Sequence, residues 1–564
     1  SLIVTQIHAH ATLCNRQATS TQYLQLNQRN NINKTTIQSF MPLEDKLTNW
    51  KTAVLIFLAI TIIFTSPIYS TLTNFGIHDW DQHLLYEGTA RETILMYHQF
   101  PLWNPWQCGG NVMLANPQSS FLSVHFPITL LFGEIIGTKL AIPLYLFIGL
   151  LGMWFVCRKL EMAPLASYFP PIVLMLSGIY AIRVAVGHTN WFHLAWIPWI
   201  FFFYLKAQEK WIHIIPAVFL LALIFLGGGI HPFIIAIVLL GIYALVTTMI
   251  EWKKHKAKPL LIFLLLFILW IPFAAIKVFP MMTVYGEMLP LEQTDVQPIS
   301  ATILFEALTN NEKSITDVYY DDNNNDSQFP WYWHEYYSYI GIFSLILCLG
   351  TALFFFKKYA RYILSICIVF FIMVSQQLFP SAWRFIQSLP FASIFHGPSR
   401  FLFAAVFFIA VLIGFGVSWV EDKKQKYVSF ILIVLLLFII ADLVMSNAHY
   451  MSEGFSIEPK EEIEKKEFYT IYAETDESSN QYQTFLENKG IWNCYERFHP
   501  LQVALPKESS AGQEYGNYHG EAYMFETNEV LGISEFTPNK ITINVGNKEG
   551  TIMLNQNYIS GWKV

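Results

Sequence analysis

Long apolar stretches alternate with polar segments along most of the chain. An α-helix of about 20 residues crosses a hydrocarbon core of ~30 Å. The pattern therefore predicts an all-α polytopic membrane bundle of about eleven transmembrane helices. The predicted spans are 52–70, 138–157, 165–186, 190–206, 212–227, 230–250, 259–279, 337–356, 360–377, 400–420 and 427–446.

Short basic segments and longer aromatic or acidic segments alternate between these spans. Cytoplasmic loops are enriched in Lys and Arg, so basic segments such as Arg158-Lys159 and Lys253–Lys258 are predicted to be cytoplasmic. The apolar stretch 121–136 does not fit this alternation as a crossing, and we expect an interfacial or re-entrant helix there. We then expect a multi-pass cell-membrane protein with a cytoplasmic N-terminus. Its outer parts would be the loops 72–136, 280–336 and 378–399 and a C-terminal domain.

Composition supports this division of the chain. Of the 564 residues, 54% are hydrophobic and 13% are charged, about half the charged share of a typical soluble domain. We expect a polar N-terminal tail (1–45), a transmembrane domain (46–447) and a small β-rich extracytoplasmic domain (448–564). Residues 540–558 alternate around the turn Gly546-Asn547-Lys548, which predicts a β-hairpin. The chain ends within an apparently continuing strand, which leaves open whether this domain is cut short.

The six cysteines are scattered and include no C-x-x-C pair. This pattern argues against a metal knuckle and against a disulfide framework. Cys108 and Cys494 both fall outside the membrane in the predicted topology, but the sequence does not favour a bridge between them.

The polar run from Leu72 to Phe121 carries the strongest candidate chemistry. Asp79 and Asp81 follow the first span closely, and charge placed at a membrane rim costs desolvation energy, so it usually has a use. Titratable and aromatic residues gather on the same predicted side, which indicates an aqueous cavity at the outer surface. For any single histidine there, the simpler interpretation is that outer loops are where polar residues go.

Several motifs carry a resemblance to a known family. An Asp soon after the first span, then P-L-W-N-P-W-Q-C-G-G-N from Pro101 and A-N-P-Q from Ala115, resembles the polytopic GT-C glycosyltransferases, specifically the YfhO-like branch. Further matches follow in order: G-H-T-N-W-F-H-L-A-W-I-P-W from Gly187, G-G-G-I-H-P from Gly227, W-H-E-Y-Y-S-Y-I-G from Trp333, G-P-S-R-F-L from Gly397 and N-Y-I-S-G-W-K from Asn557.

The resemblance implies an integral membrane enzyme that moves a sugar from a polyprenyl-phosphate donor to an extracytoplasmic acceptor. It implies an essential Asp in the first outer loop, which here is Asp79, with Asp81 as its neighbour. The acceptor could be a glycan, a lipid or a protein. Membrane lipids surround the bundle, and no nucleic-acid partner is expected.

The chemistry explains these residue types. A carboxylate can take the proton of the attacking acceptor hydroxyl, and a guanidinium can bind the lipid phosphate that leaves. Arg400 is the first candidate for the phosphate and Arg183 the second, although Arg400 could equally be an interfacial residue that reaches toward water. The candidate sugar- or acceptor-binding residues are His83, Trp103, Asn104, Trp106, Gln118, His188, His231, His334 and Glu335; for the tryptophans, membrane anchoring is the alternative.

Three alternatives stay open. The sequence establishes no definite cofactor, and Asp79 and Asp81 would suit a divalent cation such as Mg²⁺ or Mn²⁺. The chain could be a non-catalytic scaffold with a GT-C-like fold. It could also be a lipid or solute transporter, although a transporter would place its polar site near the membrane midplane.

Overall fold

The computed structural model describes residues 43–288, 299–315, 318–319, 331–388, 397–423, 427–463, 471–473, 481–494, 498–509 and 512–564. Most of the predicted N-terminal tail lies outside the described residues. The chain divides into two compact units, 1–56 and 57–564. Helix α2 (Leu43–Thr48) lies in the first unit, and α3 (Trp50–Thr65) with η2 (Ser66–Thr71) runs into the second.

Among the described residues, eight helices are long and apolar enough to cross a membrane. They are Trp50–Thr71, Glu134–Lys159, Ala166–Ala185, Ile230–Ile250, Lys258–Glu287, Phe356–Ser375, Pro398–Glu421 and Val428–Glu453. Two shorter apolar helices, Trp211–Leu226 and Ile342–Phe354, match two more predicted spans. The predicted span 190–206 instead forms η4 (Thr189–Trp196) and α9 (Ile197–Ala207). The mostly helical membrane architecture is therefore confirmed, but the count of eleven is not.

The helical elements follow one another with few long breaks. Beyond those already named they are α4 (Trp80–Leu95), α5 (Phe126–Phe132), α6 (Glu134–Lys159), η3 (Ala166–Tyr168), α7 (Phe169–Met175), α8 (Gly178–Ala185), η5 (Trp211–His213), α10 (Ile214–Leu226), α11 (Ile230–Ile250), α12 (Trp252–His255), α13 (Lys258–Leu269), η6 (Ile271–Ala274), α14 (Ala275–Val284), η7 (Tyr285–Glu287), α15 (Ala301–Thr309), η8 (Trp333–Glu335), α16 (Ile342–Phe354), α17 (Phe356–Leu378), α18 (Pro380–Gln387), η10 (Pro398–Phe401), α19 (Leu402–Glu421), α20 (Val428–Asn447), α21 (Tyr450–Glu453) and α22 (Gln481–Leu486).

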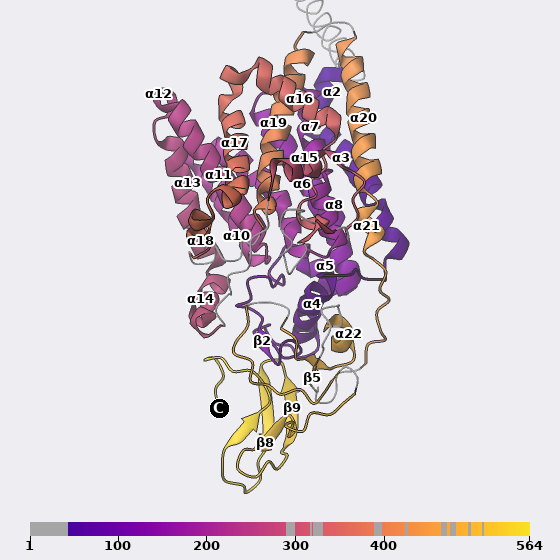
Figure 1. The fold of residues 1–564 in the computed structure, drawn as a ribbon, viewed down its shortest axis with the longest axis vertical. Coiled ribbons are helices and arrows are strands. Elements are labelled where there is room, and N and C mark those ends of the chain that lie inside the picture. Colours follow the sequence, from indigo (N-terminus) through magenta and orange to yellow (C-terminus); the bar gives the residue numbers. More distant parts are fainter. Residues whose placement is uncertain are drawn as a thin grey trace, which may run out of the picture. The chain divides into compact units, whose positions relative to one another are not determined.

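Helix α19 forms the centre of the helical packing. It is buried on nearly all sides and packs against α7, α16 and α17 (Figure 1). A helix that is apolar all round can be stable in such a position because no face has to meet water.

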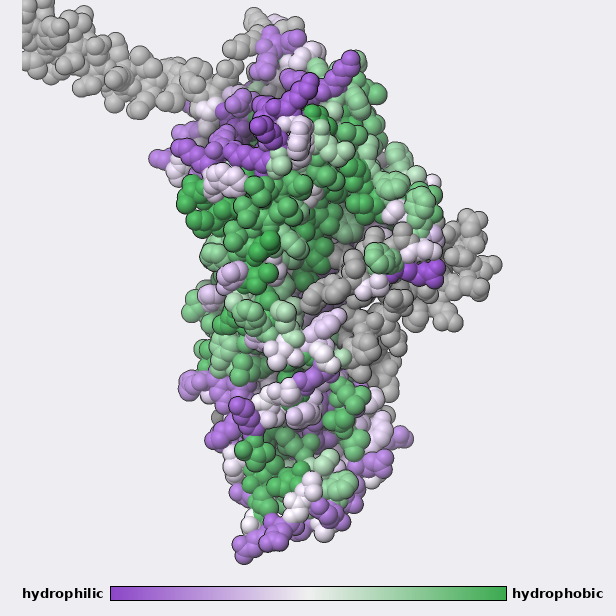
Figure 2. Space-filling model, turned by 90° about the vertical axis from the view of Figure 1, so that its left-hand side faces the viewer, coloured by the Kyte–Doolittle hydropathy of each residue, from purple (hydrophilic) through white to green (hydrophobic). Residues whose placement is uncertain are grey.

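The outer helices present apolar side chains instead. On the face shown in Figure 2, hydrophobic residues form a broad band over the helical region, with hydrophilic residues on either side. Large side chains such as Leu353, Phe354 and Met445 are exposed. A soluble monomer rarely exposes so much contiguous apolar surface, whereas a lipid-facing surface requires it.

The stretch 121–136 contains α5, which is only seven residues long. It turns into α6 at Gly133, whose φ is 79°, and it packs against α6. A helix of this length is too short to cross a membrane. It therefore adds no crossing between α4 and α6.

The C-terminal domain covers the polar segment that follows α3. Helix α4 has almost no apolar face, yet most of its residues are buried. Helix α22 packs directly on it (Figure 1). The neighbouring strands β1 (Trp103–Asn104) and β2 (Asn111–Val112) form an antiparallel pair.

The C-terminal domain contains short strands, as predicted, but with a different pairing. Strand β5 (Ile471–Ala473) lies between β6 (Gly490–Ile491) and β7 (Glu508–Ser509), parallel to both. Strand β8 (Ala522–Met524) pairs with β11 (Ile552–Leu554), and β9 (Gly532–Thr537) pairs with β10 (Lys540–Asn544), both antiparallel. A further pair, β3 (Val318–Tyr319) and β4 (Trp331–Tyr332), lies in the loop before η8.

The predicted hairpin around residues 546–548 is therefore wrong. The chain reverses instead at Pro538-Asn539, a two-residue connection of the kind that suits hairpins. Strands β10 and β11 flank the predicted turn but pair with different partners. Residues 555–564 form turns and loops rather than a continuing strand.

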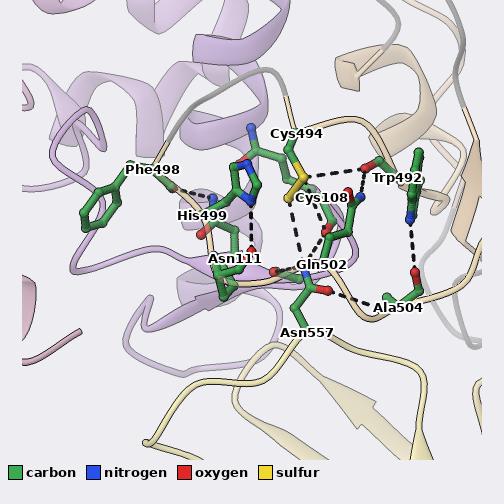
Figure 3. The surroundings of a disulfide bond; sticks show 12 residues. Cys108, Asn111, Trp492, Cys494, Phe498, His499, Gln502, Ala504 and Asn557 are labelled. Atoms are coloured by element: carbon green, nitrogen blue, oxygen red, sulfur yellow. Dashed lines mark hydrogen bonds between the residues drawn. A yellow bond between two sulfur atoms is a disulfide. The ribbon is translucent and has the colours of Figure 1, made fainter. Parts of the chain in front are cut away.

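A disulfide joins Cys108 to Cys494, so the prediction that disfavoured this bridge is wrong (Figure 3). The two Cα atoms lie 4.5 Å apart, although 386 residues separate them in sequence. The Asn557 side chain donates to the carbonyl oxygens of Cys108 and Gly110 at 2.5 and 3.0 Å. Gly110 adopts a φ of 107°, which favours glycine. The bridge therefore depends on the contact between the C-terminal domain and the segment that carries Cys108. No local sequence pattern reveals this contact.

Candidate active site

Seven of the predicted site residues form one connected group, called here the charged cluster. Neighbouring members lie within hydrogen-bonding or ion-pairing distance of one another. They come from six segments of the chain, between α4 and α19. The members are Asp79, Arg183, His188, His231, His334, Glu335 and Arg400.

Asp79 is held where the start of α4 meets the turn between α8 and η4. Its backbone N–H donates to the carbonyl oxygen of Val186 at 3.1 Å, and the Trp80 indole N–H donates to Val184 O at 2.7 Å. Gly187 has a φ of 83°, and a Cβ there would collide with the backbone of Trp80. The glycine therefore allows the close approach that places Asp79 next to His188.

The hydrogen bonds fix the tautomer of His188. Arg183 Nη1 lies 2.8 Å from His188 Nδ1, and because a guanidinium can only donate, Nδ1 must accept. Nε2 then carries the proton and donates to Asp79 Oδ2 at 3.0 Å. A neutral His188 thus orients the Asp79 carboxylate, whose side chain at 22% exposure is the most open of the charged groups in the cluster.

Glu335 joins the two arginines. Arg400 donates through Nε to Oε2 at 3.1 Å and through Nη2 to Oε1 at 2.8 Å, a bidentate arrangement. Arg183 Nη2 lies 3.0 Å from Oε2. Burial by itself would raise the pKa of Glu335, but the two guanidinium groups outweigh burial and hold it well below its usual range. Glu335 therefore stays ionised.

The sequence analysis missed Trp191, which shapes the same cluster. The Arg183 guanidinium lies over its ring, 4.2 Å from the centroid, and the His231 ring lies 5.7 Å away. His231 Nε2 is 3.1 Å from Arg400 Nη1. Trp191 thus contacts Arg183 directly and Arg400 through His231. Its position three residues after His188 is the sequence feature that could have identified it.

Three histidines, His334 within the cluster and His78 and His83 beside it, are held neutral. Burial lowers the pKa of His334 to about 3 and that of His83 to about 4, and it lowers the pKa of His78 as well. His83 lies one turn after Asp79 on α4 and is buried. These rings can accept or donate a hydrogen bond but carry no charge at neutral pH.

Asp81 lies outside the charged cluster. Its Oδ2 accepts the backbone N–H of Gln481 at 2.8 Å and its Oδ1 that of Tyr482 at 2.9 Å, at the start of α22. The side chain is buried, with Asp81 only 2% exposed. Its position fits the attachment of the C-terminal domain better than catalysis.

Trp103, Asn104 and Trp106 also lie elsewhere, where the segment between α4 and α5 meets the C-terminal domain. The indole N–H of Trp103 donates to Gln556, and that of Trp106 donates to Asn488. Asn104 Oδ1 accepts from the Thr89 hydroxyl and from the backbone N–H of Trp106. All three side chains are buried, so they stabilise this interface and expose no ring face for a sugar.

Gln118 lies beside η4, where its Oε1 accepts from Asn190 Nδ2 at 3.2 Å. The neighbouring backbone is held by Lys277, a buried lysine of α14 that the sequence analysis did not single out. Its Nζ donates to Ser119 O at 2.7 Å and to Pro117 O at 3.3 Å. A lysine inside a membrane span is a signal that could have found it.

A second buried polar chain was also missed. Glu87 lies 3.4 Å from His125 Nε2, His125 Nδ1 lies 3.2 Å from the Tyr145 hydroxyl, and that hydroxyl lies 3.3 Å from His193 Nε2. All four side chains are buried. The chain ties α4 to η4 across α6.

The arrangement does not fit a divalent cation at Asp79 and Asp81, because Asp81 has both oxygens on backbone N–H groups of α22. His188, His334 and Glu335 do place ligand atoms within 4.8 Å of one another. However, two guanidinium groups already contact Glu335, and their positive charge opposes a cation. No catalytic step is therefore assigned to a metal.

No protein-family model and no curated protein matches the chain. Among solved structures it is similar to the archaeal oligosaccharyltransferase AglB from Archaeoglobus fulgidus in complex with an inhibitory peptide and a dolichol-phosphate, with 12% identity and a TM-score of 0.45 over 81% of this chain and 65% of that one. It is similar to the arabinofuranosyltransferase AftD from Mycobacteria, with 13% identity and a TM-score of 0.44 over 72% of this chain and 27% of that one. It is also similar to ArnT from Cupriavidus metallidurans in the apo state, with 14% identity and a TM-score of 0.39 over 76% of this chain and 84% of that one. The chain thus spans less than two thirds of the length of the first two.

Proposed function

We propose that this chain is an integral membrane glycosyltransferase of the GT-C type that moves a sugar from a polyprenyl-phosphate donor to an extracytoplasmic hydroxyl. The observation that carries the proposal is the charged cluster: a partly open carboxylate oriented by a neutral histidine, next to two arginines. The ordered motifs that resemble the YfhO-like branch supply four of its segments.

Asp79 would act as the general base. The acceptor oxygen attacks the anomeric carbon as Asp79 takes its proton, and the bond from that carbon to the phosphate oxygen breaks with its electron pair on the phosphate. The hydrogen bond from His188 Nε2 to Oδ2 would orient the Asp79 carboxylate for this proton transfer.

Arg400 and Arg183 would stabilise the charge that develops on the leaving phosphate. Both are fixed before substrate binds, since Glu335 and Trp191 hold their guanidinium planes. Such preorganised positive charge acts more strongly in a site that excludes water. Arg400, whose side chain is 10% exposed against 4% for Arg183, is the more accessible of the two.

The disulfide supports an extracytoplasmic site. Disulfide bonds persist in oxidising compartments and are rare in the cytosol, and Cys108–Cys494 joins the first outer segment to the C-terminal domain. The basic loops at the other ends of the spans favour a cytoplasmic position for those ends. Both features agree with an active site on the outer side of a cell membrane.

The test uses the purified full chain in lipid nanodiscs with radiolabelled polyprenyl-phosphate sugars and a mixture of glycan, lipid and peptide acceptors. We expect transfer by the wild type and a loss of about 10²–10⁴-fold in Asp79→Asn, with assembly unchanged. Wild-type donor binding without transfer would contradict the proposal and favour a scaffold. Equal transfer by the wild type and Asp79→Asn would contradict the role of Asp79 as the base. Accumulation of intact donor inside sealed vesicles would favour a transporter.

A further inference from the structure

Glu335 occupies the part of Arg400 that a phosphate would be expected to use. The carboxylate takes both Nε and Nη2 of that guanidinium at 3.1 and 2.8 Å, which is the edge that binds carboxylates and phosphates in bidentate fashion. Glu335 also contacts Arg183 Nη2 at 3.0 Å. The acid thus competes with any anionic ligand for both arginines.

The position of Glu335 also sets the charge of the site. Its side chain and that of Arg183 are each 4% exposed and Arg400 is 10% exposed, so solvent screens these charges weakly. The two guanidinium groups and the Glu335 carboxylate sum to one positive charge, and the ionised Asp79 carboxylate brings the whole cluster to zero until it takes the acceptor's proton. The nearby His334 and His78 add none, because burial lowers the pKa of both rings.

The charge on the lipid phosphate changes during the proposed reaction. A sugar phosphodiester carries one negative charge, whereas the lipid phosphate left after transfer carries up to two, since its second pKa is about 6. Asp79 loses its charge in the same step by taking the acceptor's proton. The total charge is conserved, but the product binds the arginines as a dianion.

We propose that Glu335 is a specificity-determining residue: by neutralising one of the two guanidinium charges, it matches the site to a singly charged lipid phosphodiester and prevents tight retention of a doubly charged lipid phosphate or diphosphate. The inference rests on the proposed function. A purely structural ion pair would predict the opposite effect, because breaking it would only weaken the site.

The decisive variant is Glu335→Gln, with Glu335→Asp as the charge-conserving variant and Glu453→Gln as the matched control. Glu453 lies on α21 and its carboxylate contacts His449 and Ser314 rather than an arginine. The probes are a polyprenyl phosphate and the polyprenyl diphosphate of the same chain length. Their affinities are measured by thermal-shift titration of each purified full-length variant in nanodiscs.

In Glu335→Gln we expect polyprenyl phosphate to bind about tenfold more tightly or better, and product inhibition of transfer to increase by a similar factor. Glu453→Gln should bind polyprenyl phosphate as the wild type does, and Glu335→Asp, which keeps the negative charge, should gain less affinity than Glu335→Gln. A gain of affinity cannot arise from misfolding. Weaker or unchanged binding of polyprenyl phosphate by folded Glu335→Gln would overturn the proposal.

The wild type supplies a second test if Glu335→Gln does not fold. It should bind polyprenyl diphosphate no more tightly than polyprenyl phosphate, and a preference for the diphosphate of about tenfold or more would overturn the inference. Should the wild type bind neither lipid, the proposed function fails with it. Should it transfer sugar while Glu335→Gln binds no more tightly, only the role of Glu335 fails.

Discussion

Asp79 and Asp81 lie two residues apart, yet the structure predicts different consequences when each is changed to Asn. Asp81 accepts two backbone N–H groups of α22, so Asp81→Asn should loosen the C-terminal domain. Asp79 contacts His188 at the open side of the charged cluster, so Asp79→Asn should lower the proposed transfer by about 10²–10⁴-fold and leave the fold intact. The pair therefore separates a structural carboxylate from a chemical one.

The size of the Asp81 effect follows from its contacts. Both hydrogen bonds are short, at 2.8 and 2.9 Å, and the residue is buried. Hydrogen bonds to a charged group contribute about 1.5–3 kcal/mol each. Asn keeps one oxygen acceptor but turns an NH₂ group toward the second N–H, so one bond is lost and one donor is left buried. We expect the docking of α22 to weaken by about 2–4 kcal/mol.

Hydrogen–deuterium exchange of the full chain in nanodiscs measures this directly. Backbone amides of residues 481–491 should exchange faster in Asp81→Asn than in the wild type, while Asp79→Asn should leave them unchanged. Peptides from α19 serve as the internal reference, since that helix is buried against α7, α16 and α17. Equal protection of 481–491 in wild type and Asp81→Asn would refute the assignment, as would loosening by Asp79→Asn.

Three further changes test other features. Replacing Cys108 and Cys494 together by Ser should weaken attachment of the C-terminal domain by about 2–4 kcal/mol, and wild type treated with reductant should show the same drop in melting temperature; no drop in either would contradict the bridge. Burial raises the pKa of Glu521 to about 7 from 4.5, so the stability contributed by its neutral form is complete below about pH 4.5 and is lost as the pH rises through about 7. Thermal unfolding of Glu521→Gln across this window should be flatter than that of the wild type. Lys277→Met should unfold at lower temperature and lose protection of residues 117–119, because three carbonyl oxygens lose their donor; an unchanged exchange rate there would show that Lys277 does not hold this segment.

The hydrophobic pattern was sufficient for the membrane architecture. A helix that crosses lipid must satisfy its backbone internally and present apolar side chains along its whole length, so a local window of sequence carries the information. Eight spans appear where the pattern places them. It failed where the chain breaks into short elements, as at η4 and α9, because composition does not reveal a change of helix type.

The strand pairing and the disulfide show the limit of local patterns. Alternation correctly marked β10 and β11 as extended, but their partners lie on β9 and β8. Cys108 and Cys494 meet only because the C-terminal domain covers the segment between α4 and α5. Contacts between segments hundreds of residues apart leave no periodic signature in either segment.

The residue types and the family resemblance together pointed to Asp79, Arg183, Arg400 and Glu335 as candidates, since charge near a membrane needs a reason to be there and a lipid-phosphate donor calls for a guanidinium. Only the tertiary structure decided that these side chains meet, that Asp81 turns away to α22, and that Glu335 lies between the two arginines. The physical reason is that burial and charge pairing are properties of the packed chain: a carboxylate acquires its role from the groups brought against it, and these come from segments that the sequence keeps far apart.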